Sequence, residues 1–271
     1  MKQLGRYVLN KNYHIIQQEV EREVIRAIRK KEFQLYLQPK VDTQREQLAG
    51  AEVLIRWKRH FKEMVRPDEF IPILEEYGAI TKLDEYVFHE MCKLQKKWIK
   101  QGIFIPLSMN ESRRHLRNEN HIEQLLQEVT NYSIPTHLIE LEMAESAVVE
   151  DILQAKRAQQ KAHQLGFLVA MDDFGVGYSS FSMLKNIPID ILKIDKTFFD
   201  EITQNERGKV IIESIVQMAK KLNSKTVAEG IETKEQVEYL KKIGCDYIQG
   251  YYYSVPIKIE EFEQKWLNNK D

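Results

Sequence analysis

The chain has 271 residues, of which 43% are hydrophobic and 30% charged, enough apolar material for a sizeable core. Its 40 basic and 41 acidic residues nearly cancel, which excludes a general affinity for DNA, RNA or anionic membranes. Two cysteines, Cys92 and Cys245, exclude a disulfide framework and a cysteine-rich zinc site. Because there is no signal-peptide pattern, and no apolar run near the roughly 18 residues of a transmembrane helix, we expect a soluble, cytoplasmic chain without a membrane segment.

The N-terminal region predicts a helix over residues 13–31, because apolar residues recur there every four positions. We expect residues 1–31 to form a connector helix and residues 32–271 to form one domain. Two strands are expected next, over residues 33–42 and 47–57. The turn between them is too short for a helical crossover, so they should run antiparallel.

Helices and strands then alternate along the chain. Helices are expected over residues 67–77, 81–101, 119–131, 150–164, 179–186, 206–222, 233–243 and 258–268. Strands are expected over residues 103–109, 138–143, 167–172, 190–194, 225–229 and 246–249. This order implies an α/β fold, a TIM-type (β/α)8 barrel with an antiparallel first strand and a site at the C-terminal strand ends.

Most of these apolar strands end on polar side chains. The residues concerned are Glu52, Asn110, Glu142, Glu145, Asp172, Asp173, Lys193, Asp195, Glu229, Glu232 and Gln249. An ionised carboxylate at the end of a buried strand needs a partner or a metal. Because the strand ends share one mouth of a barrel, we expect a ring of oxygen ligands there.

Carboxylate and amide oxygens are the ligands that Mg²⁺ and Mn²⁺ prefer, and these ions commonly bind phosphate substrates. The histidines lie in helical or loop stretches away from the strand ends, and no HExxH motif is present, which disfavours zinc. The set therefore favours two-metal hydrolysis of a phosphoester. Local alternatives remain for single residues: Asn110 could cap a helix, Lys193 could lie at the surface, and Asp195 could be structural.

Several motifs in order resemble the EAL family of bacterial cyclic-di-GMP phosphodiesterases. The signature tripeptide is Glu52, Val53 and Leu54. The others are QP (38–39), SMNES (108–112), ELEMAES (140–146), DDFGVGYSS (172–180), LKID (192–195), AEGIE (228–232) and QGYYYSVP (249–256). The resemblance covers residues 32–268 and implies a barrel with an antiparallel first strand.

The resemblance implies a role for each matching residue. Metal ligands would be Glu52, Asn110, Glu142, Asp172, Asp173 and Glu229. Catalysis would rest on Lys193, which would hold or deprotonate the attacking water, with Glu52 and Glu229. Substrate contacts would come from Arg56, Gln38, Leu54, Gln249 and Asp195. Glu145 and Glu232 would anchor the loop over residues 172–180.

The implied reaction opens cyclic-di-GMP to linear pGpG by in-line attack, with two Mg²⁺ or Mn²⁺ ions per site and Ca²⁺ as an inhibitor. A receptor that binds cyclic-di-GMP without cleaving it is the alternative, and a barrel enzyme acting on another phosphoester is a third. The resemblance also implies a homodimer through the barrel helices and the loop around residues 173–181, and an upstream sensory or cyclase domain. Val53, Ala144, Val176 and Val255 depart from the usual pattern, which leaves the affinity open.

Overall fold

A computed structural model describes residues 2–145, 152–175, 184–185, 187, 189–199 and 206–268. Most of the expected helix over residues 179–186 and most of the loop over residues 172–180 lie outside these described residues. The chain divides into two compact units, described separately: residues 1–35 with 55–91, and residues 36–54 with 92–271.

The first unit contains helix α1 (Lys2–Arg29) and helix α2 (Pro67–Tyr77), together with the outer part of a hairpin. In this hairpin β2 (Leu48–Arg59) pairs antiparallel with β3 (Glu63–Val65), a short strand that was not predicted from the sequence. The unit is packed around three aromatic rings, those of Phe33, Trp57 and Phe70, with centroids 5.2–5.9 Å apart. Buried Glu32 accepts hydrogen bonds from Arg26 Nη1 at 2.7 Å and from Trp57 Nε1 at 3.1 Å, so its charge is paired.

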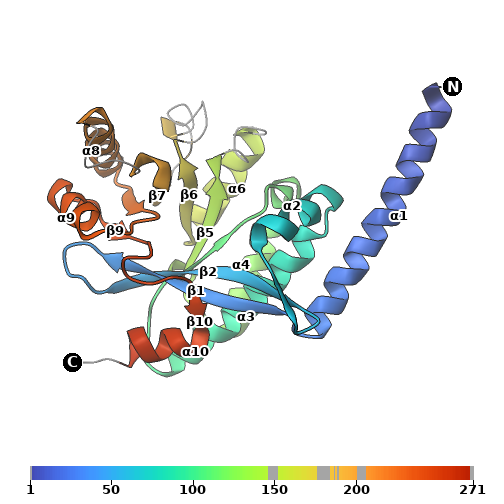
Figure 1. Cartoon of the computed structure of the whole chain (residues 1–271), viewed down its shortest axis with the longest axis horizontal. Coiled ribbons are helices and arrows are strands. Elements are labelled where there is room, and N and C mark those ends of the chain that lie inside the picture. Colours follow the sequence, from blue (N-terminus) through green and yellow to red (C-terminus); the bar gives the residue numbers. More distant parts are fainter. Residues whose placement is uncertain are drawn as a thin grey trace. The chain divides into compact units, whose positions relative to one another are not determined.

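The second unit is a closed barrel, seen with its central strands β5, β6 and β7 side by side in Figure 1. Its remaining strands are β1 (Phe33–Asp42), β4 (Leu107–Asn110), β5 (Ile139–Ala144), β6 (Leu168–Phe174), β7 (Ile191–Ile194), β8 (Lys225–Ala228), β9 (Tyr247–Ile248) and β10 (Ile257–Lys258). The order around the barrel is β1-β9-β8-β7-β6-β5-β4-β2, and pairing of β1 with β2 closes it. Strand β1 is antiparallel to β9, while β2 and β4 to β9 pair in parallel. The predicted barrel with an antiparallel first strand is confirmed.

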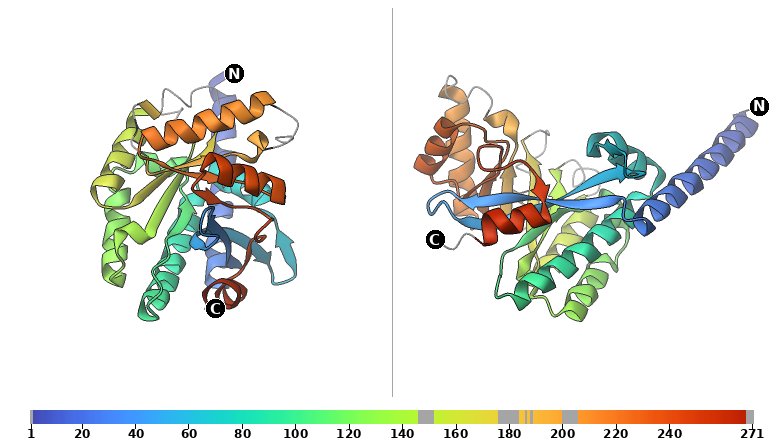
Figure 2. Two further views of the ribbon diagram at one scale, coloured as in Figure 1. Left: turned by 90° about the vertical axis from the view of Figure 1, so that its left-hand side faces the viewer. Right: turned by 60° about the horizontal axis from the view of Figure 1, so that its bottom comes forward.

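Helices connect the parallel strands, and Figure 2 shows them along the outside of the sheet in two further views. They are α3 (Ile80–Lys100, which begins in the first unit), α4 (His121–Tyr132), α6 (Ile152–Gln164), α8 (Glu206–Lys221), α9 (Lys234–Ile243) and α10 (Ile259–Phe262). Short 3₁₀ turns occupy Arg113–Arg117, Thr136–Leu138 and Lys196–Phe198. The last predicted helix starts at Ile259 and continues as a π-helical turn over Glu263–Leu267, because residues 257–258 pair with β1 as β10.

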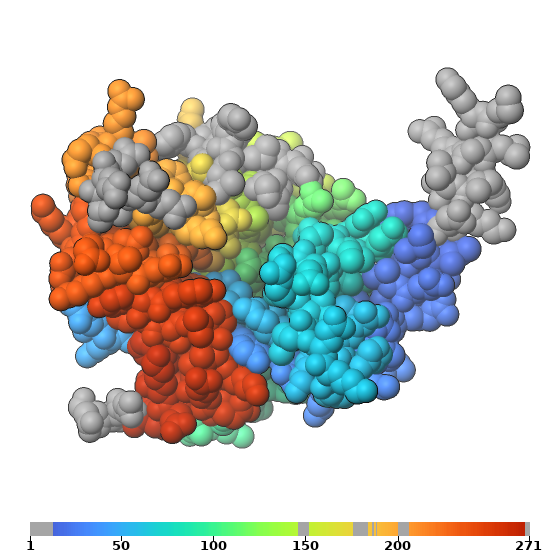
Figure 3. Space-filling view, in the orientation of Figure 1, coloured from blue at the N-terminus to red at the C-terminus, as the bar shows by residue number. Residues whose placement is uncertain are grey.

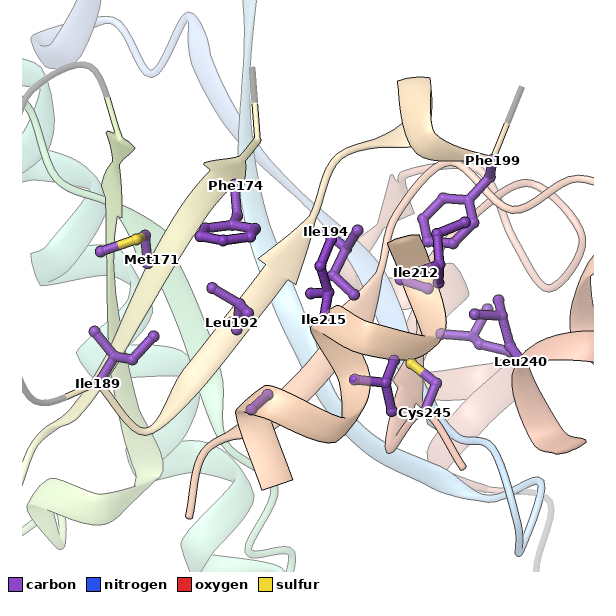
Figure 4. Close-up of a cluster of buried hydrophobic side chains, with 14 of the residues drawn as sticks. Met171, Phe174, Ile189, Leu192, Ile194, Phe199, Ile212, Ile215, Leu240 and Cys245 are labelled. Carbon is purple, nitrogen blue, oxygen red and sulfur yellow. The ribbon is translucent and has the colours of Figure 1, made fainter. Parts of the chain in front are cut away.

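Alternation along the strands decides which side chains reach the interior of the barrel. Leu192 and Ile194 of β7 pack with Ile212 and Ile215 of α8 in the buried cluster of Figure 4. Lys193 lies between them in the strand, so its side chain points to the opposite face. The apolar face of the strand thus holds the helix in place while the polar face lines the barrel.

Cys92 and Cys245 are free and buried. Figure 3 shows α9 and the C-terminal segment, coloured orange to red, on one face of the second unit. Within the part of the chain that the structure describes, no helix combines the length and hydrophobicity needed to span a membrane.

Candidate active site

The register of the parallel strands brings residues distant in sequence to one level of the barrel. Glu52 of β2 pairs with Ser108 of β4, and Asn110 lies two positions further on the same strand face. Asn110 in turn pairs with Glu142 of β5, and Glu142 pairs with Ala170 of β6. The site residue lies two positions further along from β2 to β4 and from β5 to β6, but not from β4 to β5, because the strands of a closed barrel are staggered.

The same stagger continues around the other half of the barrel. Asp172 lies at the end of β6, and Lys193 occupies the middle of β7. Lys193 pairs with Val227 of β8, and Glu229 follows two positions later. Each polar residue therefore shares a strand face with its neighbours, and together they line the C-terminal mouth.

Lys193 is the centre of this site. Its Nζ lies 2.6 Å from Glu142 Oε2, 2.9 Å from Glu229 Oε1, 3.0 Å from Asp172 Oδ1 and 3.6 Å from Glu52 Oε2. The residue is 1% exposed, which excludes the surface position considered from sequence. Burial acts to lower the pKa of Lys193, but the surrounding carboxylates outweigh it and hold the pKa well above its ordinary value.

A second buried lysine, Lys40, contacts the carboxylate of Glu142 as well. Lys40 Nζ lies 2.8 Å from Glu142 Oε1 and 2.8 Å from Glu140 Oε1, and all three residues are buried. Burial acts to raise the pKa of Glu142, but the charges of Lys193 and Lys40 outweigh it and set the pKa at about 2. Lys40 and Glu140 were not among the site residues predicted from the sequence, although each stands two positions from a predicted residue on the same strand face.

Glu52 is held by two side-chain amides. Asn110 Nδ2 donates to Glu52 Oε1 at 2.9 Å, and Gln249 Nε2 donates to Glu52 Oε2 and, at 3.1 Å, to Gln38 Oε1. Gln38 Nε2 donates to the carbonyl of Ser254 at 3.1 Å. Burial raises the pKa of the Glu52 carboxyl, because the desolvated charge is only partly compensated.

Asp172, Asp173 and Glu229 each offer a carboxylate oxygen, and these oxygens all lie within 4.8 Å of one another. Asp173 has a φ of 55°, in the left-handed region, where the register of β6 shifts between Met171 and Phe174. Its backbone N–H donates to Asp172 Oδ1 at 2.9 Å. A non-glycine residue in this conformation costs free energy, and such strain is typical of functional sites.

The loop that follows Asp173 starts from a fixed point. The backbone N–H of Gly175 donates to Glu145 Oε2 at 3.0 Å, the contact that a loop anchor would make. Gly175 has a φ of 98°, and a Cβ at this position would collide with the ring of Phe198. Glu232 is exposed and its N–H donates to Gln236 Oε1 at 2.9 Å, so its role as a loop anchor stays a prediction. Gly177 and the rest of the motif lie outside the described residues.

Three of the residues predicted to contact the substrate have no contact with Lys193 described above. Asp195 caps the 3₁₀ turn that follows β7, where its Oδ1 accepts hydrogen bonds from Thr197 N at 2.9 Å and Thr197 Oγ1 at 2.6 Å. Leu54 is the last β2 residue of the second unit. Arg56 belongs to the first unit, where its Nη1 donates to the carbonyl of Ile55 at 2.9 Å. Their substrate roles stay predictions.

The donor set fits divalent cations. Six carboxylates and two lysines meet at or below the mouth: Glu52, Glu140, Glu142, Asp172, Asp173, Glu229, Lys40 and Lys193. When all are ionised, four negative charges stay uncompensated, and two divalent cations carry four positive charges. Glu52, Glu140, Glu142 and Asp172 are buried, and uncompensated charge on buried groups is costly. Carboxylate and amide oxygens suit Mg²⁺ and Mn²⁺.

Comparison with known proteins finds one family. The model of the family described as "EAL domain" matches residues 21–256. The oxygen sensor protein DosP of Escherichia coli is 36% identical over 244 residues, which are 90% of this chain and 30% of DosP. The cyclic di-GMP phosphodiesterase NbdA of Pseudomonas aeruginosa is 30% identical over 247 residues, which are 91% of this chain and 32% of NbdA. The chain thus spans about a third of these relatives.

Solved structures give the same result. The PaMucR phosphodiesterase in complex with c-di-GMP superimposes with a TM-score of 0.83 at 28% identity, over 90% of this chain and 99% of that one. An EAL domain protein of Listeria monocytogenes gives a TM-score of 0.78 at 32% identity, over 89% of this chain and 95% of that one.

Proposed function

Because the chain belongs to the EAL domain family, we propose that it hydrolyses cyclic-di-GMP to linear pGpG with two divalent cations, Mg²⁺ or Mn²⁺, at the mouth of the barrel. The observation that carries this proposal is the position of Lys193 among Glu52, Glu142, Asp172 and Glu229. A receptor has no need of a buried lysine enclosed by carboxylates.

The residues that would hold the cations are Glu52, Asn110, Glu142, Asp172, Asp173 and Glu229. Bound there, the ions would neutralise charge on the phosphate oxygens and activate water for attack on phosphorus. Glu142 is suited to this task because its pKa of about 2 keeps it ionised at neutral pH. Calcium should inhibit, since its larger and looser coordination relaxes the spacing of the ligands.

Lys193 would orient the attacking water, and two carboxylates would accept its proton. The Lys193 ammonium would orient the attacking water opposite the leaving 3′-oxygen of the ribose, so that one P–O bond forms as the other breaks. Burial raises the pKa of Glu229 well above its ordinary value, which makes this carboxylate a better acceptor for the proton that water releases. Glu52 shares the same direction of shift and the same proposed role.

The names of similar proteins support the proposal that the substrate is cyclic-di-GMP. NbdA is named a cyclic di-GMP phosphodiesterase, and PaMucR was solved with c-di-GMP. We assign substrate contacts to Gln38, Gln249, Leu54, Asp195 and Arg56 on this basis. Because the chain spans about a third of its relatives, we also propose an upstream sensory or cyclase domain, attached through residues 1–31. We further propose that residues 32–271 form the barrel domain and that the protein is a homodimer.

The direct test is incubation of the chain with Mn²⁺ and cyclic-di-GMP, followed by chromatography of the nucleotides. We expect pGpG from the wild type, and at least a hundredfold less from Glu52→Ala. Tight binding of cyclic-di-GMP that stays intact would identify a receptor instead. Hydrolysis of another phosphodiester without competition by cyclic-di-GMP would identify a different barrel enzyme.

A further inference from the structure

A second cluster of possible metal ligands lies beside the barrel mouth, on the segment that joins β4 to α4. Glu111 follows β4 directly, His115 lies in the 3₁₀ turn and His121 begins α4. The three residues are 8%, 6% and 8% exposed. Each offers one ligand atom, and these atoms all lie within 4.8 Å of one another.

Local hydrogen bonds hold this segment in place. The Glu111 N–H donates to the carbonyl of Glu142 at 2.8 Å, which continues the β4–β5 pairing. Ser112 caps the 3₁₀ turn, since its hydroxyl accepts from Arg114 N at 3.3 Å. The His121 N–H donates to the carbonyl of Asn118 at 3.0 Å. The turn therefore brings two histidines six positions apart against one glutamate.

The side chains within the cluster are in contact. Glu111 Oε2 lies 2.6 Å from His121 Nε2, and the rings of His115 and His121 stack with centroids 3.9 Å apart and planes at 15°. The second oxygen of Glu111, Oε1, is buried and has no hydrogen-bond partner among the described residues. A buried carboxylate oxygen in that condition is costly unless a cation or a donor meets it.

A pocket of about 300 Å³ adjoins the cluster, lined by all three residues and by Gln159 of α6. Gln159 is 0% exposed, and its Oε1 also has no hydrogen-bond partner within the described part of the chain. Two unpartnered buried oxygens thus line the same pocket as two imidazoles. The pocket has room for an ion and for water in its remaining coordination positions.

We propose that Glu111, His115 and His121 form a binding site for a zinc-class transition-metal ion. Two imidazole nitrogens and one carboxylate are a common zinc donor set, which leaves a fourth position open toward the pocket. Nitrogen donors also separate this site from the oxygen ligands around Lys193, which suit Mg²⁺ and Mn²⁺. The histidines lie away from the strand ends, and their meeting with Glu111 depends on the turn.

Binding at this site has a structural consequence. A metal lies close to the plane of each imidazole that binds it, and two rings stacked at 15° cannot both meet that condition. One ring therefore rotates out of the stack when the ion binds. The proposal is independent of the proposed reaction, since it uses no residue assigned to the barrel mouth.

The test measures zinc binding to the full chain by equilibrium dialysis, with the protein stripped of metals and then saturated with Mg²⁺. We expect the wild type to bind one more Zn²⁺ per chain than the double variant His115→Gln, His121→Gln. The matched control is His163→Gln, at an exposed histidine of α6, which should bind zinc like the wild type. Equal zinc stoichiometry and affinity in all three proteins would overturn the proposal.

A second measurement needs no variant. X-ray absorption of the Mg²⁺-saturated wild type with one equivalent of Zn²⁺ should show two imidazole nitrogens at about 2.0 Å. A shell made of oxygen alone would place the zinc elsewhere. Failure of the wild type to bind zinc would leave Glu111 and His121 as a buried hydrogen-bonded pair only, and would also overturn the proposal.

Discussion

Replacement of Lys193 by methionine is the sharpest test of the site, because it should change stability and metal affinity in opposite directions. The methionine keeps most of the side-chain length but removes the charge that lies within 3.0 Å of Glu142, Glu229 and Asp172. Removing one partner of a buried ion pair costs about 3–5 kcal/mol. For a chain of this size, the metal-free protein should melt roughly 6–20 °C lower.

Divalent cations should reverse this loss. The carboxylates that lose Lys193 repel one another, and a bound cation restores the missing positive charge. The variant should therefore bind Mn²⁺ roughly tenfold more tightly than the wild type, since an ammonium no longer competes for the carboxylates. Turnover of cyclic-di-GMP should fall about 10²–10⁴-fold, because the ammonium proposed to orient the attacking water is gone.

Calorimetry with and without Mn²⁺ and a turnover assay would measure these three effects. Lys221→Met is the matched control, since Lys221 lies exposed in the last turn of α8 and should change none of them. If Lys193→Met leaves the metal-free melting temperature unchanged, or weakens Mn²⁺ binding, the electrostatic account of the site is wrong.

Three further predictions follow from the same geometry. Glu52→Gln removes a charge whose burial is costly but keeps only one acceptor for the two amides of Asn110 and Gln249, so the metal-free protein should stay within about 1–3 kcal/mol of the wild type in chemical denaturation. Mn²⁺ affinity measured by calorimetry should drop at least tenfold. Burial raises the pKa of Glu229 well above its ordinary 4.5, so a cation that binds there must displace a proton. Mn²⁺ affinity should therefore rise with pH above 4.5. An Mn²⁺ affinity that does not change with pH would contradict this assignment. Gly250→Ala would place a Cβ closer than 3.0 Å to the backbone of Ile231. We expect the free energy of unfolding, measured by chemical denaturation, to fall by about 1–3 kcal/mol or more. An unchanged free energy of unfolding would show that the backbone can shift.

The barrel could be predicted because its signals are local. Buried strands are apolar, helices show a period near four, and the short turn between residues 42 and 47 leaves no room for a crossover. The structure adds β3 and β10, which are short and carry little periodicity of their own. Their pairing depends on strands that the rest of the chain provides.

The candidate site was predicted from the polar residues at strand ends, but its internal contacts were not. Lys40 stands in an expected strand, and nothing local shows that its ammonium meets Glu140 and Glu142 a hundred residues later. The three-residue cluster of Glu111, His115 and His121 was missed for the same reason. Motif spacing describes positions along strands, whereas these contacts depend on register and on the path of a turn.

The sequence by itself determined the order of strands and helices and the chemical type of the groups at the strand ends. Both follow from side-chain polarity and spacing along the chain, which do not depend on distant residues. Only the tertiary structure decided that Lys193 is enclosed by carboxylates of four different strand ends, and that Glu142 lies between two lysines. Barrel closure and stagger set those distances, and the interaction between buried charges depends on distance and on the exclusion of water.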